Sequence, residues 1–271
     1  MSVTELGSVQ KTLFLPLWGR AVEARKAHPL LVDRAAVDLI STIDYDFSTI
    51  ARNISVITQL AWIARSLHTD RVIVDFLARH PAAACVNLGC GLDTTFERVD
   101  NGRVCWYDLD LPDVVELRRK YIPAGGRRKL LACSLLDHQW LRQIGSAEAV
   151  LFIASGVLYY FEETQVKALF RKLADAFPGS EIFFDACSPR GMRIANRKVI
   201  QAGGMDETAF LKWGLQTPRD LAAWDSRIAV LAEYPMFRNM KRGLSLKEKI
   251  GTTVSDLLGI MSMVHLRFGS G

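Results

Sequence analysis

A short apolar run near the middle of the chain ends in a turn whose residues could hold a ligand. Gly89 and Gly91 flank Cys90, and Asp93 and Thr94 follow. Glycines at such positions allow unusual backbone dihedrals and let a ligand approach without meeting a side chain. A dinucleotide turn would have Gly or Ala where Thr94 stands, and a pyrophosphate would be repelled by the Asp93 carboxylate. These residues favour a ligand that is zwitterionic or cationic near the turn, although G-x-G alone also occurs in ordinary tight turns.

A second chemical feature follows the next apolar run, in the segment WYDLDLP. Asp108 and Asp110 lie where that run stops at Pro112, and Asp110 comes nineteen positions after Gly91 (110 − 91). An acidic residue at roughly this offset accepts hydrogen bonds from ribose hydroxyls. The turn and the carboxylate together predict a nucleoside with a tail that carries no phosphate. S-adenosylmethionine fits that description.

The elements that must position these residues are expected from the apolar pattern. Short apolar runs alternate with helical stretches after Pro81, and strands buried on both faces have this continuous pattern. The alternation predicts parallel strands with right-handed crossovers, a doubly wound α/β sheet. Such sheets bind ligands beyond the carboxyl ends of their strands. The expected strands are residues 84–88, 103–109, 129–134, 149–155 and 181–187, with 227–237 and 263–268 as a late antiparallel pair.

The same pattern predicts a single domain with four parts. Residues 1–82 are expected to form an N-terminal helical cap, in which 21–43 and 53–80 carry apolar residues at helical spacing. Residues 83–187 form the cofactor-binding core. Residues 188–226 lack a strand pattern and are interpreted as a substrate lid inserted before the last two strands, which fall in 227–271.

Composition limits the possible functions. The chain has 271 residues, 49% hydrophobic and 23% charged, and its net charge is +5. No apolar run is long enough to span a membrane, and the N-terminus lacks the basic-then-apolar order of a signal peptide, so a cytoplasmic location is expected. The basic clusters lack the dense stripe of a nucleic-acid reader. Five scattered cysteines and five scattered histidines show no metal-ligand spacing, so neither a metal site nor nucleic acid is expected.

Four segments together resemble a known family. The chain is similar to the leucine carboxyl methyltransferase family, nearest its bacterial branch that contains a polyketide-synthesis O-methyltransferase. The segments are TLFLPLWGRA, VNLGCGLDTTFERV, WYDLDLPDVVELR and FIASGVLYYF. The resemblance is densest from Thr12 to Cys187. It implies a class I, Rossmann-like methyltransferase fold and S-adenosylmethionine as the cofactor.

The resemblance also implies roles for individual residues. Arg65 would grip the methionine carboxylate, for which the planar fork of arginine is suited. Two positions depart from the family pattern: Ser155 stands where members often have an acidic residue, and Ser134-Leu135 where some have Asp-Leu beside the adenine. The expected cofactor-binding residues are Arg65, Gly89, Cys90, Gly91, Asp93, Asp110, Leu111, Ser134, Leu135 and Ser155.

The methyl acceptor is less well defined by the sequence. A carboxylate acceptor needs no base at neutral pH, whereas a phenol or alcohol usually does. No residue stands out as that base, because His138 and His265 are both expected to be structural. The predicted function is O-methyl transfer to a carboxylate or hydroxyl of a small, aromatic or polyketide-like acceptor. The candidate pocket residues are Tyr159, Tyr160, Phe210 and Trp213.

Several alternatives stay open at this stage. The family resemblance also allows a protein C-terminal carboxyl methyltransferase, and Ser155 keeps open a catalytically degenerate S-adenosylmethionine-binding protein. A nicotinamide dehydrogenase is disfavoured by Asp93 and Thr94. A nucleic-acid methyltransferase would explain the positive charge but not the weak basic clusters. Association into a homodimer is possible, and the sequence does not identify the acceptor.

Overall fold

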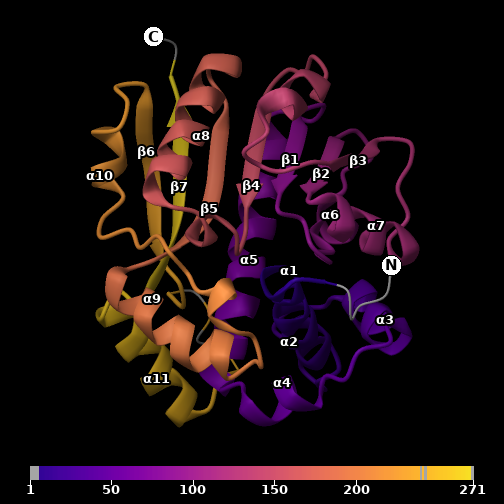
Figure 1. Ribbon diagram of the computed structural model, residues 1–271, viewed down its shortest axis with the longest axis vertical. Coiled ribbons are helices and arrows are strands. Elements are labelled where there is room, and N and C mark those ends of the chain that lie inside the picture. Colours follow the sequence, from indigo (N-terminus) through magenta and orange to yellow (C-terminus); the bar gives the residue numbers. More distant parts are fainter. Residues whose placement is uncertain (1–5, 239, 241–242, 270–271) are drawn as a thin grey trace.

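A computed structural model describes residues 6–238, 240 and 243–269. Its centre is a seven-stranded sheet in the order β3-β2-β1-β4-β5-β7-β6. The first five strands are parallel, and β7 runs antiparallel to both of its neighbours (Figure 1). The strands are β1 (Ala84–Leu88), β2 (Cys105–Asp110), β3 (Arg128–Ala132), β4 (Val150–Ala154), β5 (Glu181–Cys187), β6 (Ile228–Pro235) and β7 (Met261–Phe268). The predicted doubly wound α/β sheet and its class I methyltransferase strand order are therefore confirmed.

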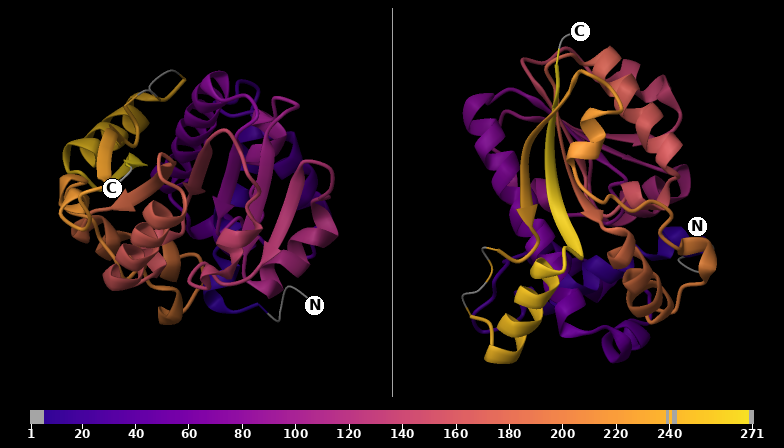
Figure 2. Two further views of the ribbon diagram at one scale, coloured as in Figure 1. Left: turned by 90° about the horizontal axis from the view of Figure 1, so that it is seen from above. Right: turned by 90° about the vertical axis from the view of Figure 1, so that its left-hand side faces the viewer.

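The strands form where continuous apolar runs can be buried on both faces. The bounds of β1 and β5 equal the predicted ranges, and every residue of both strands is buried. Successive side chains point to opposite faces, so Val86 joins one hydrophobic core and Cys85 the other. Helix α8 (Glu163–Ala176) covers the first face and α5 (Val56–Arg79) the second (Figure 2).

Local signals fix the ends of these helices. Ser55 caps α5 by accepting a hydrogen bond from the backbone N–H of Thr58, and the helix ends before Pro81. The segment 21–43, which carries apolar residues at helical spacing, is divided between the end of α2 (Phe14–Ala24) and α3 (Arg34–Thr42). Pro29 lies between them and disfavours helical dihedrals at the residue before it.

The N-terminal helices gather at the carboxyl ends of the parallel strands (Figure 1). These helices are α1 (Ser8–Lys11), α2, α3 and α4 (Ser48–Asn53). Two further helices, α6 (Thr95–Val99) and α7 (Pro112–Tyr121), flank the first strands. None of the helices in the described ranges is both long and apolar enough to cross a membrane.

The helices that follow β5 lie at the same end of the molecule, except for the short helix that precedes β6 (Figure 1). Residues 188–226 hold α9 (Pro189–Ala195), the π-helical turn η4 (Asn196–Gln201), the short η5 (Glu207–Ala209) and α10 (Arg219–Ala222). The sequence interpretation missed α11 (Leu246–Leu257), which connects β6 to β7. Its signal was present, because Ser245 and Glu248 form a capping box ahead of the helix.

Candidate functional site

A cavity of ≈ 570 Å³ lies at the carboxyl ends of the parallel strands. This volume is in the range of small-molecule binding sites. The wall combines strand-end turns after β1, β2 and β4 with α5, the N-terminal helices, α9, η4 and α11. The cavity has two halves of different character, a polar one at the strand ends and an apolar one under the later helices.

The turn after β1 is held in one conformation. Gly89 and Gly91 have φ of 66° and 45°, the left-handed region in which a Cβ is strained. A Cβ built on Gly89 would lie 2.0 Å from Cγ2 of Val157. The N–H of Gly91 donates to Oδ2 of Asp110 (2.7 Å), and its carbonyl accepts from Nη1 of Arg118 (2.8 Å). The turn is therefore fixed from both sides by buried charged groups.

Asp110 ends β2 beside this turn and lines the cavity. Its Oδ1 accepts from the backbone N–H of Leu111 (2.8 Å), which also lines the cavity. Burial raises the pKa of Asp110 to about 6, so the carboxyl is mostly ionised at neutral pH. A carboxylate offers about four acceptor sites and two are used here, so capacity for ligand hydroxyls is left.

The structure changes the physical interpretation of Asp93. Burial opposes ionisation of this carboxyl, yet the guanidinium groups of Arg20, Arg98 and Arg118 lower its pKa to about 2. Its oxygens accept from the N–H and hydroxyl of Thr95 (both 3.0 Å). Its charge is compensated locally, so repulsion of a pyrophosphate is weaker than the sequence suggested. Thr94 in place of a third small residue remains the stronger argument against a dinucleotide.

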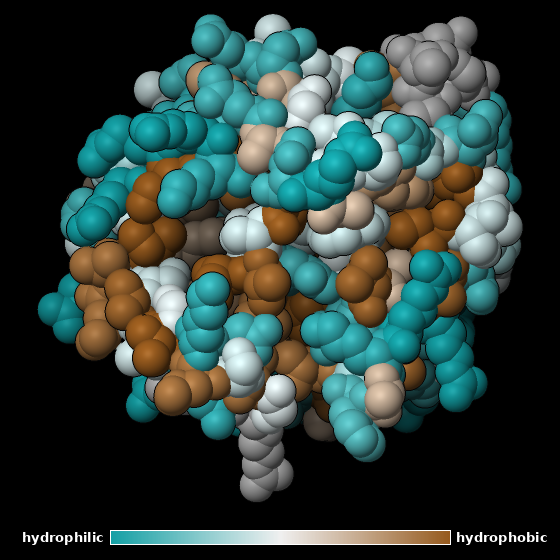
Figure 3. Space-filling model, turned by 90° about the horizontal axis from the view of Figure 1, so that it is seen from below, coloured by the Kyte–Doolittle hydropathy of each residue, from teal (hydrophilic) through white to brown (hydrophobic). Residues whose placement is uncertain are grey.

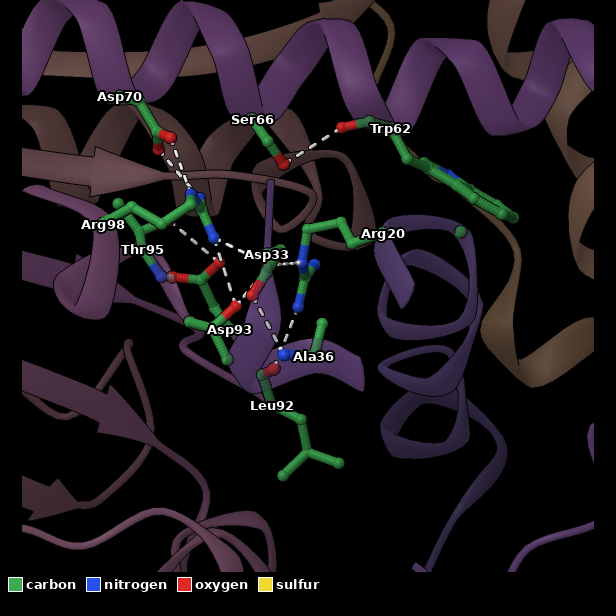
Figure 4. A network of polar contacts seen from close by, with 12 residues as sticks. Arg20, Asp33, Ala36, Trp62, Ser66, Asp70, Leu92, Asp93, Thr95 and Arg98 are labelled. Carbon is green, nitrogen blue, oxygen red and sulfur yellow. Dashed lines mark hydrogen bonds and ion pairs between the residues drawn. The ribbon is translucent and has the colours of Figure 1, made fainter. Parts of the chain in front are cut away.

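Asp33, which the sequence analysis did not single out, ties the N-terminal helices to the turn (Figure 4). Its Oδ2 accepts from Nε of Arg20 (2.9 Å), Nη1 of Arg98 (2.8 Å) and the hydroxyl of Thr94 (2.6 Å). Nη2 of Arg20 donates to the carbonyl of Leu92 (3.0 Å). Residues from α2, the start of α3, the turn and α6 therefore share one buried carboxylate.

Arg65 comes from α5 and lines the cavity. It is only 8% exposed. Its Nη1 donates to Oδ2 of Asp185 (3.0 Å) and to the hydroxyl of Tyr159 (3.3 Å). Ser155 also lines the cavity, and its hydroxyl lies 3.2 Å from that of Thr69.

Two of the predicted cofactor-binding residues lie outside the cavity wall. Ser134 and Leu135 follow β3, which ends at Ala132, earlier than predicted. The chain turns there, so Leu135 is buried in the core, where its carbonyl accepts from Nε1 of Trp140 (3.2 Å). Leu135 lies away from the cavity because its side chain packs in the hydrophobic core.

Phe210 and Trp213, two of the predicted acceptor-pocket residues, do not line the cavity. Trp213 is 4% exposed and stacks on Phe184 in the core that α8 covers. Phe210 packs against the core of the N-terminal helices. Between them in sequence, Leu211 does reach the cavity. An aromatic-rich segment without periodicity gave no indication of which side chains point inward.

The apolar half of the cavity lies under the later helices. Tyr159 and Tyr160, the other two predicted acceptor-pocket residues, line the cavity, and burial raises the pKa of Tyr160 to about 12. Figure 3 shows hydrophobic side chains gathered on this face of the molecule, on the side where α9 and α11 lie. The apolar contributors from these helices and the adjoining loop are Ile194, Val199, Leu211, Val254 and Leu258.

Few charged side chains line the cavity. Within the described part of the chain they are Arg20, Arg65, Asp93, Asp110 and Lys198, and no histidine or glutamate accompanies them. The carboxylates and arginines belong to the polar half, whose hydrogen bonds are given above. Among the residues that the structure describes, the apolar half thus contains no carboxylate or imidazole that could act as a general base.

The fold and this cavity define a class I methyltransferase. The family model for leucine carboxyl methyltransferase matches residues 14–174. The chain is 33% identical over 218 residues to the tetracenomycin polyketide synthesis O-methyltransferase TcmP of Streptomyces glaucescens, covering 80% of this chain and 78% of that protein. It is 28% identical over 262 residues to the S-adenosyl-L-methionine-dependent methyltransferase dpfgK of Gibberella zeae, covering 86% of each. The chain belongs to the leucine carboxyl methyltransferase family and is an S-adenosylmethionine-dependent methyltransferase.

Solved structures agree on the fold. A crystal structure of a Thermobifida fusca protein from the methyltransferase fold class superposes with a TM-score of 0.58 at 16% identity, covering 93% of this chain and 94% of that one. A DUF574 family protein from Streptomyces avermitilis gives a TM-score of 0.57 at 11% identity, covering 93% and 97%. At these identities the likeness concerns the architecture.

Proposed function

We propose that the chain is an O-methyltransferase that acts on a small, aromatic or polyketide-like acceptor. One observation carries the proposal: a single cavity joins a polar half suited to the cofactor with an apolar half that has room for a flat ligand. The similarity to TcmP supports the same acceptor class. A free small molecule as acceptor and a cytoplasmic location are part of the proposal.

The residues of the polar half fit S-adenosylmethionine. Arg65 offers a cation to the methionine carboxylate, Asp110 offers an acceptor to ribose hydroxyls, and Gly89 and Gly91 have no side chains that would obstruct a ligand. When bound, the cofactor supplies an electrophilic methyl group on a sulfonium. What this chain contributes is orientation and exclusion of water, which are the main requirements of an in-line displacement.

A carboxylate is the acceptor group that agrees best with the apolar half. A carboxylate is already a nucleophile at neutral pH, whereas a phenol must lose a proton. Desolvation raises the pKa values of buried Tyr159 and half-buried Tyr160 above the usual range, so they stay protonated and can donate hydrogen bonds but not accept a proton. Lys198 lines the same half and supplies a cation to attract an acid.

A transfer assay with labelled S-adenosylmethionine tests this proposal. The acceptors are polycyclic aromatic acids, the matching phenols, and peptides with free C-terminal carboxylates. We expect label in the aromatic acids that is released by mild base, as methyl esters require. Label in peptides alone would favour a protein carboxyl methyltransferase. Binding of S-adenosylhomocysteine without turnover of any acceptor would favour a degenerate binding protein.

A further inference from the structure

Asp185 lies just behind the cavity wall, between two elements that line it. It is on β5, it is fully buried, and it does not itself line the cavity. Its Oδ2 accepts from Nη1 of Arg65 (3.0 Å) and its Oδ1 from the backbone N–H of Gly156 (2.6 Å). One carboxylate therefore connects the arginine on α5 to the turn that follows β4.

The ion pair with Asp185 leaves some N–H groups of the Arg65 guanidinium without a hydrogen-bond partner in the described chain. Within the described chain, the hydrogen bonds of Arg65 run from Nη1, to Asp185 and Tyr159. The residue also lines the cavity, so its other N–H groups can serve a ligand there. Because the guanidinium is planar and rigid, fixing one nitrogen fixes the direction of the remaining donors.

The surroundings allow Arg65 little freedom to reorient. Gly156 has φ of 82°, and a Cβ built on it would lie 2.7 Å from Nη1 of Arg65. The backbone after β4 thus approaches the guanidinium closely on one side. A buried arginine without a partner would also be strongly destabilising, so the Asp185 carboxylate is needed when no ligand is present.

We propose that Asp185 is a positioning residue for the cofactor. It holds Arg65 so that the free side of the guanidinium meets the carboxylate of the methionine moiety, and it does not touch the cofactor. This inference rests on the proposed role of Arg65 in the site. It has a specific consequence: replacing Asp185 weakens only ligands that carry the amino-acid tail.

Two ligands separate this role from a merely structural one. S-adenosylhomocysteine carries the amino-acid tail, whereas 5′-methylthioadenosine has the nucleoside and thioether but no tail. Both are titrated calorimetrically into the wild type, Asp185→Asn, Arg65→Ala and the double variant. Glu181→Gln is the matched control, because Glu181 is also a buried carboxylate on β5 but pairs with His265, Arg267 and Arg79 away from the cavity.

We expect Asp185→Asn to weaken S-adenosylhomocysteine binding by about tenfold to a hundredfold, the loss typical of a hydrogen bond to a charged group. Binding of 5′-methylthioadenosine should stay within about twofold, since the nucleoside contacts remain. The double variant should lose no more affinity than Arg65→Ala, and Glu181→Gln should lose none. If Asp185→Asn does not fold, Arg65→Lys is measured instead. Lysine keeps the ion pair with Asp185 but lacks the planar fork of arginine, so we expect only the binding of S-adenosylhomocysteine to weaken.

Other outcomes overturn the inference. Equal weakening of both ligands by Asp185→Asn, or by Arg65→Lys in its place, would mean that the ion pair only supports the fold. Unchanged S-adenosylhomocysteine affinity would mean that Arg65 does not depend on Asp185. If the wild type bound neither ligand, the cofactor site itself would be wrong and this role of Asp185 would be wrong with it. Binding of both ligands with no effect of Arg65→Ala would leave the proposed function intact and refute only the positioning role.

Discussion

The two halves of the cavity are built by different means. The polar half is made of strand-end turns that buried ion pairs hold in place, such as that between Arg118 and Asp108, both fully buried. The apolar half is closed by short helices, and α11 leaves large apolar side chains in solvent: Leu246 is 75% exposed and Leu257 is 80% exposed. The half proposed to bind the cofactor is held by directional contacts between buried charges, whereas the half proposed to bind the acceptor rests on non-directional apolar contacts.

The largest effect should come from breaking an ion pair beneath the polar half. Asp108→Ala leaves Arg118 and Arg128 buried without their shared carboxylate. We expect the free energy of unfolding to fall by about 3–5 kcal/mol, as for other buried pairs that lose one partner. Urea denaturation followed by circular dichroism measures it.

An exposed ion pair is the control for this variant. Arg71 and Asp75 pair on the surface of α5 with side chains 70% and 67% exposed. Arg71→Ala should change the free energy of unfolding by less than about 0.5 kcal/mol. A loss below about 1 kcal/mol for Asp108→Ala would show that the buried charges do not hold the polar half in place.

A smaller effect concerns the pH dependence of cofactor binding. The pKa of Asp110 is about 6 in the free protein because of burial. Ribose hydroxyls donate to the ionised carboxylate, so binding below pH 6 must displace a proton. The dissociation constant of S-adenosylhomocysteine should therefore rise about tenfold for each pH unit below 6 and be flat above about 7.

Asp110→Asn separates this titration from others in the protein. The amide does not ionise, so the variant should bind more weakly at pH 8 and show no step near pH 6. A step that persists in Asp110→Asn would assign the titration to another group, and the ribose role of Asp110 would lose its support.

The smallest effect is expected on the outer surface of α11, the helix that helps to close the apolar half. Leu257→Ser replaces a side chain that is already mostly in solvent and does not line the cavity. The free energy of unfolding should change by no more than about 0.5 kcal/mol, and S-adenosylhomocysteine affinity by less than about twofold. A loss above 2 kcal/mol in denaturation experiments, or a marked loss of cofactor affinity, would contradict the division of the cavity into two independent halves.

The sequence predicted those features of the fold and the site that depend on residues close together in the chain. The strand ends, the Gly89–Gly91 turn and Asp110 could be predicted because buried parallel strands are continuous apolar runs and ligands bind at their carboxyl ends. Arg65 was identified only through the family resemblance, since an arginine on an amphipathic helix carries no signal of its own. Whether these residues bind the cofactor stays a prediction.

Contacts between distant segments could not be predicted in the same way. Asp33 and Arg98 are 65 positions apart, and Arg65 and Asp185 are 120 apart. No spacing rule connects residues whose contact depends on how the whole sheet folds. The sequence also could not show that Trp213 is buried away from the cavity, because a core aromatic side chain and a ligand-binding one have the same residue type. By contrast, α11 had its capping box in the sequence and could have been found.

A crystal structure of the complex with S-adenosylhomocysteine tests the central claim most directly. We expect density for the nucleoside between the Gly89–Gly91 turn and Asp110, with the carboxylate of the tail at Arg65. The apolar half beneath α9 and α11 should stay free for an acceptor. Density for the ligand in the apolar half, or a nucleoside far from Asp110, would contradict the proposed cofactor site.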